Sequence, residues 1–293
     1  IVSNDCDSLT RRMGQVGRAA PAHAGFHGEL HAAFHPNVSF LCKATLLRST
    51  LSIAVAAALG IAAFPAAAHE YTSTVTGSFT HDEDVTITPS SGNGISLTQA
   101  QSYDFSVGNH QLSISGGTNG IHFDVRPGSS SPAEIVFTGD VSLTGQTKTG
   151  INVYRITNTT VDFYGKVSVS HANSGMDVNT STNSSMIFHQ GLSLTDLDFG
   201  VSTYYAAIRN QDGFTIWASD ITIDNVSSSQ GSPFSGIESN SGIIWVSSES
   251  VGGTGRLSIS RVTSNTQSTR GYYSWGGDVG ADQIIISDIE SKV

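Results

Sequence analysis

The sequence predicts an all-β fold, a right-handed parallel β-helix (β-solenoid) of about seven coils. Three observations predict it. A pattern of alternating apolar residues recurs every 25 to 35 residues, a period typical of chains that complete one coil per repeat. The 293 residues include 31 Gly and only 13% charged residues, which favours short strands joined by tight turns. No segment combines a 3.6-residue apolar stripe with helix caps.

The clearest copies of the repeat lie in residues 134–194. In each copy two apolar residues alternate, a small or polar residue marks a corner, and two more apolar residues follow. The copies are Ile135, Phe137, Gly139, Val141, Leu143; then Val161, Phe163, Gly165, Val167, Val169; then Met186, Phe188, Gln190, Leu192, Leu194. One such coil has unpaired strand edges and an unburied apolar face, so it needs neighbouring coils. We therefore expect Phe137, Phe163 and Phe188 to form one internal column.

Residues 1–42 show no strand alternation, and we interpret them as a non-native or disordered extension. Four histidines in this segment are spaced four apart, which on a helix would place them on one face able to hold a metal: His23, His27, His31 and His35. Gly25, Gly28 and Pro36 weaken such a helix. The sequence therefore predicts neither a metal site nor a cofactor.

Residues 43–68 have the three features of a Sec-type signal peptide. Lys43 and Arg48 open it, an apolar run follows at 51–64, and an A-x-A cleavage motif ends at Ala68. The run is shorter than the roughly 20 residues that span a membrane. We expect the mature chain to begin near His69. Both cysteines of the chain precede this point, so the exported part would contain no thiol.

Residues 69–293 form the predicted β-helix. An atypical first coil would cap the stack, and we expect the domain to be truncated at its C-terminus, because the chain stops at Val293 directly after a strand pattern. Small-apolar dipeptides recur once per coil, and we interpret them as corners where glycine adopts a positive φ. They are Gly94-Ile95, Gly120-Ile121, Gly150-Ile151, Gly175-Met176, Ala207-Ile208, Gly236-Ile237 and Gly271-Tyr272.

The charge of the chain argues against nucleic acid as a partner. Fourteen Lys and Arg stand against 24 Asp and Glu, a net charge of −10, and the repeats contain no basic cluster.

A Sec-type signal followed by a thiol-free, acidic repeat of this period resembles the passenger region of bacterial autotransporters (type V secretion), which has a pectin-lyase-like right-handed β-helix. The resemblance covers about residues 43–293. It implies secretion to the bacterial cell surface through an outer-membrane translocator barrel that lies outside this fragment. It also implies a non-catalytic surface adhesin or display stalk whose partner is a host-surface protein or glycan.

A secreted carbohydrate-active β-helix enzyme, a polysaccharide lyase or glycoside hydrolase, is the alternative. Asp196 and Asp198 lie on the same side of a predicted strand, and Asp220 and Asp224 follow about one coil later. Paired carboxylates of this kind suit glycoside cleavage or a Ca²⁺ site. A lyase also needs a basic residue, and Arg209 lies near in sequence. Surface or turn-capping roles explain the same aspartates.

Aromatic residues in the second half of the chain suggest a ligand-binding face, since flat rings can stack on sugars or bury in a protein partner. The candidates are Tyr204, Trp217, Trp245 and Trp275. Core filling or stacking between coils is the more common role of such residues, and a purely structural spacer would need no ligand.

The densest acidic cluster consists of His81, Asp82, Glu83 and Asp84. It suits a solvated turn, with weak cation binding as the alternative.

Overall fold

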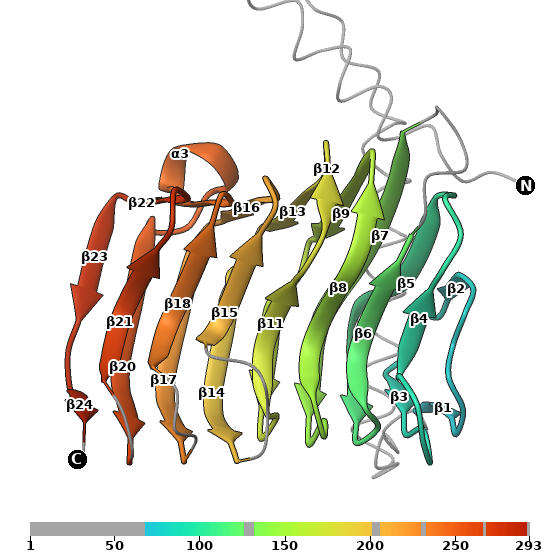
Figure 1. Cartoon of the computed structure of the whole chain (residues 1–293). Coiled ribbons are helices and arrows are strands. Elements are labelled where there is room, and N and C mark those ends of the chain that lie inside the picture. The colour runs from blue at the N-terminus through green and yellow to red at the C-terminus, as the bar shows by residue number, and fades with distance from the viewer. Residues whose placement is uncertain (1–67, 126–131, 201–205, 230–232, 266–267, 292–293) are drawn as a thin grey trace, which may run out of the picture. The chain divides into compact units, whose positions relative to one another are not determined.

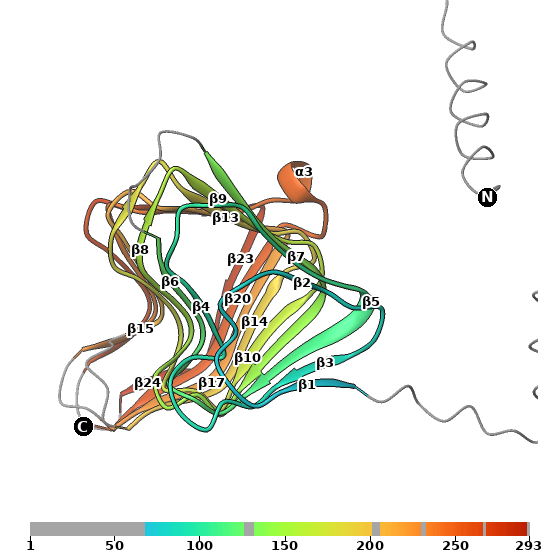
Figure 2. The same cartoon turned by 90° about the vertical axis from the view of Figure 1, so that its right-hand side faces the viewer.

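The computed structural model describes residues 68–125, 132–200, 206–229, 233–265 and 268–291. The predicted N-terminal extension and the predicted signal peptide up to residue 67 lie outside the described residues. The rest is a right-handed parallel β-solenoid of about seven coils, so the predicted fold class is confirmed (Figures 1 and 2). Within the described ranges the only helix is the single turn α3 (Ser248–Val251), and none of the described helical structure is long enough to cross a membrane.

Each coil contributes strands to three parallel stacks, which Figure 2 shows end-on. The first stack contains β2 (Phe79–Thr80), the first halves of β5 (Tyr103–Ser115) and β7 (Ala133–Thr144), β9 (Thr159–Phe163), β13 (Ser185–Phe188), β16 (Thr215–Ala218), β19 (Ile243–Val246) and β22 (Asp278–Ala281). The second contains β1 (His69–Tyr71), β3 (Val85–Ile87), the second halves of β5 and β7, β10 (Val167–Ser170), β14 (Leu192–Phe199), β17 (Asp220–Ser228), β20 (Arg256–Ser264), β23 (Gln283–Ile286) and β24 (Ile289–Ser291). Because β5 and β7 run through the bend unbroken, the first two stacks form one 16-stranded sheet.

The third stack faces the viewer in Figure 1 and is a separate sheet. Its strands are β4 (Ile95–Leu97), β6 (Asn119–Asp124), β8 (Thr149–Thr157), β11 (Ser174–Val178), β15 (Ala206–Gln211), β18 (Phe234–Asn240) and β21 (Thr269–Ser274). The short β12 (Ser181–Thr182) pairs with the end of β8. Every pairing between these strands is parallel, so equivalent positions of successive coils lie side by side.

A column of phenylalanine rings fills the core behind the first stack. The ring centroids of Phe137 and Phe163 are 4.6 Å apart, and those of Phe163 and Phe188 are 5.1 Å apart, with interplanar angles of 11° and 7°. Phe105 extends the column at 4.8 Å from Phe137, and all four side chains are fully buried. The predicted internal column is confirmed. Such ring pairs contribute about 0.5–1.5 kcal/mol each beyond the area that they bury.

The small-apolar dipeptides do not lie at corners, and the positive-φ interpretation is wrong. From Gly120-Ile121 onward they pair with one another inside the strands of the third stack, and none of their glycines has a positive φ. Glycine occurs at these positions because neighbouring atoms leave no space for a Cβ atom. A Cβ atom on Gly150 would lie 2.3 Å from Cγ1 of Val169, and one on Gly175 would lie 2.6 Å from Cδ1 of Leu194. Branched side chains of the second stack press against the backbone of the third.

Positive-φ residues form a different column, within the second stack. One residue per coil bends the strand there, with φ between 50° and 74°: Gly116, Gly145, His171, Asp196, Asn225, Arg261 and Asp288. Glycine, asparagine and aspartate tolerate this conformation best. Because the bend interrupts the alternation, Leu194 and Leu197 on either side of Asp196 both point into the core.

Candidate ligand-binding face

The outer face of the third stack carries two columns of polar and aromatic side chains. From Gly120-Ile121 onward, the residue after each small-apolar dipeptide belongs to what we call the charged column: His122, Asn152, Asp177, Arg209, Glu238 and Tyr273. From Asn152 onward, the residue two positions further on belongs to the amide column: Tyr154, Asn179, Gln211, Asn240 and Trp275. The apolar residues on either side of Asp177, Met176 and Val178, lie in the core, so both columns face outward.

Hydrogen bonds join the members of the charged column along the solenoid. His122 Nδ1 lies 2.8 Å from Asn152 Oδ1, and Asn152 Nδ2 donates to Asp177 Oδ2 over 3.5 Å. Arg209 Nε donates to Asp177 Oδ1 over 2.5 Å. Asn179 of the amide column links both residues, since it donates to Asp177 over 2.9 Å and accepts from Arg209 Nη2 over 2.9 Å. The network therefore holds these side chains in one arrangement before any ligand arrives.

The centre of the charged column contains charges that are largely removed from water. The side chain of Asp177 is 0% exposed and that of its partner Arg209 is 16% exposed. Burial raises the pKa of the neighbouring Glu238 carboxyl, the charge of Arg209 opposes that shift, and the charge of Asp177 adds to it. A buried ion pair contributes little net stability, so stability alone does not explain the charges of Asp177 and Arg209.

Exposed rings lie at both ends of the amide column. Tyr154 is 52% exposed at one end and Trp275 is 64% exposed at the other. Arg155 lies beside the ring of Tyr154, and the ring of Tyr273 meets Trp275 edge-on at 6.0 Å. Two accessible aromatic surfaces thus border a row of amides.

The aromatic residues predicted from the sequence fall on two different faces. Trp275 belongs to the third stack, whereas Trp217 and Trp245 lie side by side in register on the outer face of the first stack. Trp217 is half-buried, and Trp245 is 43% exposed with its ring over Gly280. Tyr204 lies outside the described residues.

The four aspartates predicted as an enzymatic site lie along the outer face of the second stack, and each has a local partner. Asp196 accepts from Asn225 Nδ2 over 2.5 Å, and Asp198 accepts from Ser227 over 3.4 Å. Asp220 accepts from the backbone N–H groups of residues 254 and 256.

Asp224, the fourth of these aspartates, forms a bidentate ion pair with Arg261. The Arg261 guanidinium holds the pKa of the Asp224 carboxyl below its usual value, opposite to what a general acid needs. Arg209, the predicted base, belongs to the third stack instead.

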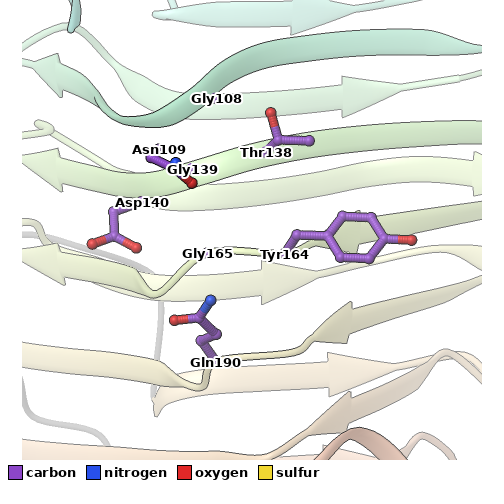
Figure 3. Close-up of a pocket in the computed structure, with 8 residues that line it drawn as sticks. All are labelled: Gly108, Asn109, Thr138, Gly139, Asp140, Tyr164, Gly165 and Gln190. Carbon is purple, nitrogen blue, oxygen red and sulfur yellow. The ribbon is translucent and has the colours of Figure 1, made fainter. Parts of the chain in front are cut away.

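A pocket of about 340 Å³ lies at the bend between the first and second stacks. Figure 3 shows the side chains around it, among them Tyr164, Asp140 and Gln190. The ring of Tyr164 stacks flat on His189 at 4.5 Å. Asp140 accepts from the backbone N–H of Lys166, so its carboxylate supports the turn of the next coil. The pocket is confined to the bend and does not join the two columns.

Comparison with known proteins finds no family model that matches the sequence, no curated protein with significant similarity and no solved structure that matches significantly.

The sequence contained the signal that locates both columns. Each small-apolar dipeptide lies in, or at the start of, a strand of the third stack, so the next residue and the one two further on face outward together. Interpreting the dipeptides as corners concealed this, and the charged column was missed except for Arg209.

Proposed function

We propose that the chain is a passenger-like β-helix, exported and displayed on the bacterial surface, that binds a glycan on the outer face of its third stack. The observation that carries the proposal is the pair of in-register columns, one charged and one amide, with an exposed ring at each end of the amide column.

The chemistry of the face favours a glycan over a protein partner. Amide side chains offer both donors and acceptors, which suits the hydroxyl groups of sugars, and exposed rings provide flat surfaces for stacking. Parallel strands place one such group per coil, about 4.8 Å apart, so an extended polymer can lie across several coils. Protein-binding surfaces are instead rich in apolar residues at their centre, which this face lacks.

Export is supported by the sequence. The Sec-type features of residues 43–68 precede the β-helix, and no cysteine follows Cys42. An autotransporter-like role further requires an outer-membrane translocator as partner.

A glycan array first identifies the glycans that the full chain binds. The dissociation constant of the full chain is then measured for each of these glycans. We expect Tyr154→Ala and Trp275→Ala each to weaken binding by about 1–3 kcal/mol, roughly five- to 150-fold, because each removes a stacking surface. Tyr164→Ala is the matched control, since Tyr164 is 46% exposed but lies away from the third stack.

The variants also separate the competing sites. If Trp217→Ala or Trp245→Ala loses glycan binding while Tyr154→Ala and Trp275→Ala keep it, the binding site lies on the first stack instead. Binding of no glycan by the parent chain would favour a structural spacer.

A carbohydrate-active enzyme is the second candidate, and one observation favours it. The raised pKa of Glu238, beside Arg209 and Asp177, is a property of catalytic acids. If the chain depolymerises a glycan that it binds, Glu238→Gln should abolish product formation while binding persists. Full activity in that variant would exclude Glu238 as the acid.

A further inference from the structure

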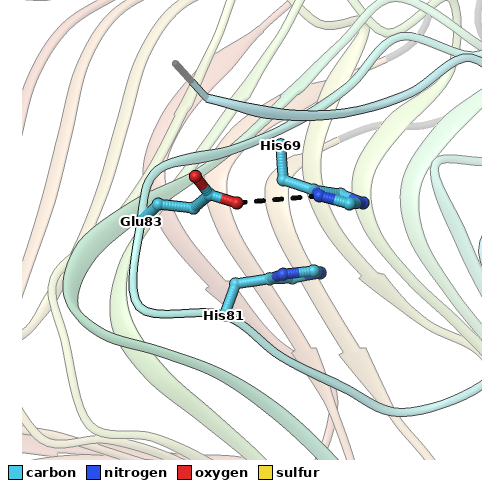
Figure 4. A group of neighbouring side chains, drawn as sticks. All are labelled: His69, His81 and Glu83. Carbon is cyan, nitrogen blue, oxygen red and sulfur yellow. Dashed lines mark ion pairs between the residues drawn. The ribbon is translucent and has the colours of Figure 1, made fainter. Parts of the chain in front are cut away.

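Three side chains able to bind a metal come together in the first coil, apart from the two columns. His69 begins β1, and His81 and Glu83 lie in the turn between β2 and β3. One ligand atom from each residue lies within 4.8 Å of the other two. Figure 4 shows the Glu83 carboxylate directed at His69, with the ring of His81 beside that of His69.

The pairing of β1 with β3 creates this group. His69 pairs with Val85, and its backbone N–H donates to the carbonyl of Asp84 over 2.7 Å. His69 Nδ1 then lies 3.7 Å from Glu83 Oε1, and the imidazoles of His69 and His81 stack with centroids 4.0 Å apart.

A further contact orients His81. The Tyr71 hydroxyl lies 3.0 Å from Nε2 of His81, which leaves Nδ1 as the ring nitrogen available to an ion. Metal-binding histidines are commonly held in this way through their second nitrogen. The three ligand residues are half-buried, so an ion can reach them from solvent.

We infer that His69, His81 and Glu83 form a binding site for a divalent transition metal of the Zn²⁺ type. Two imidazoles and one carboxylate are an established zinc ligand set. Bond lengths of about 2.0–2.2 Å place tetrahedral ligand atoms roughly 3.3–3.6 Å apart, so the observed separations need only small side-chain rotations. Imidazole ligands favour zinc, copper or nickel over magnesium and calcium.

The surroundings attract cations. Asp82 and Asp84 flank Glu83, and the sequence has no Lys or Arg between Arg48 and Arg126. His110 of the next coil lies 3.8 Å from Asp82 and 3.6 Å from Asp84, outside the ligand set. The local field therefore favours a doubly charged ion.

The proposed export adds a fourth ligand, and this step alone rests on the proposed function. Cleavage after Ala68 would make His69 the first residue of the mature chain. Its free amino group and Nδ1 could then bind one ion together as a six-membered chelate ring.

The test uses the folded full chain with a factor Xa site in place of residues 65–68 (Pro65→Ile, Ala66→Glu, Ala67→Gly, Ala68→Arg). Cutting after position 68 leaves His69 first. Removing residues 1–68 also removes the four histidines at 23–35, which could bind zinc themselves. Titration calorimetry with Zn²⁺ should then give one ion per chain.

Variants assign the ligands. We expect His81→Ala and Glu83→Gln to lower zinc affinity at least about tenfold, and Tyr71→Phe to lower it about tenfold through loss of the orienting contact. His110→Ala, a histidine beside the same acidic turn, should bind zinc like the parent. Circular dichroism of the metal-free variants checks that each is folded. The proposed site would be overturned if the folded parent bound no zinc, or if His110→Ala lost as much zinc affinity as His81→Ala and Glu83→Gln.

A second cut protein, with one alanine inserted before His69, tests the amino group. Weaker zinc binding than in the chain that begins at His69 supports the chelate. Equal zinc affinity of the two cut proteins would show that only the three side chains bind the ion. Zinc binding is measured without a glycan, so this result is independent of the proposed glycan binding.

Discussion

Steric contact between individual side chains and the backbone decides where glycine is required in this solenoid. The glycines of the third stack have ordinary backbone conformations, yet they lie where side chains of the second stack reach across the core. Close packing leaves no volume for even one methyl group at such positions.

Gly150→Ala should therefore lower the free energy of unfolding by about 1–3 kcal/mol, because its Cβ would lie 2.3 Å from Val169. Chemical denaturation measures the effect. Gly77→Ala is the matched control, since nothing lies within 4 Å of a Cβ atom there.

The double variant Gly150→Ala with Val169→Ala tests the cause. If the clash is responsible, removing the valine methyls reduces the penalty of the glycine change. Strictly additive losses would contradict the steric explanation.

At the element scale, the charged column makes the third stack sensitive to pH. Because burial raises the pKa of Glu238, the folded chain binds its proton more tightly than the unfolded chain does. Stability therefore falls as pH rises from the ordinary carboxyl pKa through the raised value, and it stays lower above that window.

Glu238→Gln should accordingly raise the unfolding temperature at neutral pH, and the gain should disappear below about pH 4, where the parent carboxyl is protonated. Arg209 keeps Asp177 as its partner in this variant. Thermal melts across this pH range measure the effect, with Glu134→Gln on the exposed face of the first stack as control. A gain that persists in acid would contradict the role of burial.

At the scale of the whole solenoid, each coil contacts only its neighbours, so stability is approximately a sum over coils and their interfaces. Folding therefore depends more on the register between neighbouring coils than on the number of coils. Ser185 pairs with Thr160, so residues 160–184 make one complete lap of 25 residues.

Deleting residues 160–184 should leave a folded, shorter solenoid in which Phe188 stacks directly on Phe137. Deleting residues 160–171 removes only part of a lap and should prevent folding beyond β8, because the three stacks fall out of step. Circular dichroism and size-exclusion chromatography distinguish the two. Equal disruption by both deletions would contradict the coil as the unit of stability.

The fold class, the coil period and the phenylalanine column could be predicted from the order of the amino acids alone. These depend on alternation along the chain, which a strand converts directly into inner and outer faces. Phe137, Phe163 and Phe188 were placed correctly because their spacings of 26 and 25 residues contain few insertions.

Which outward side chains meet is evident only in the folded chain. Because the laps vary from 25 to 35 residues, a fixed period does not find the neighbours of Asp177 and Glu238, which become evident only once the small-apolar dipeptides are seen to pair inside strands. His69 likewise joins His81 and Glu83 only because β1 pairs with β3. Side chains far apart in sequence become a site when backbone pairing aligns their strands, and that pairing depends on the insertions at the turns.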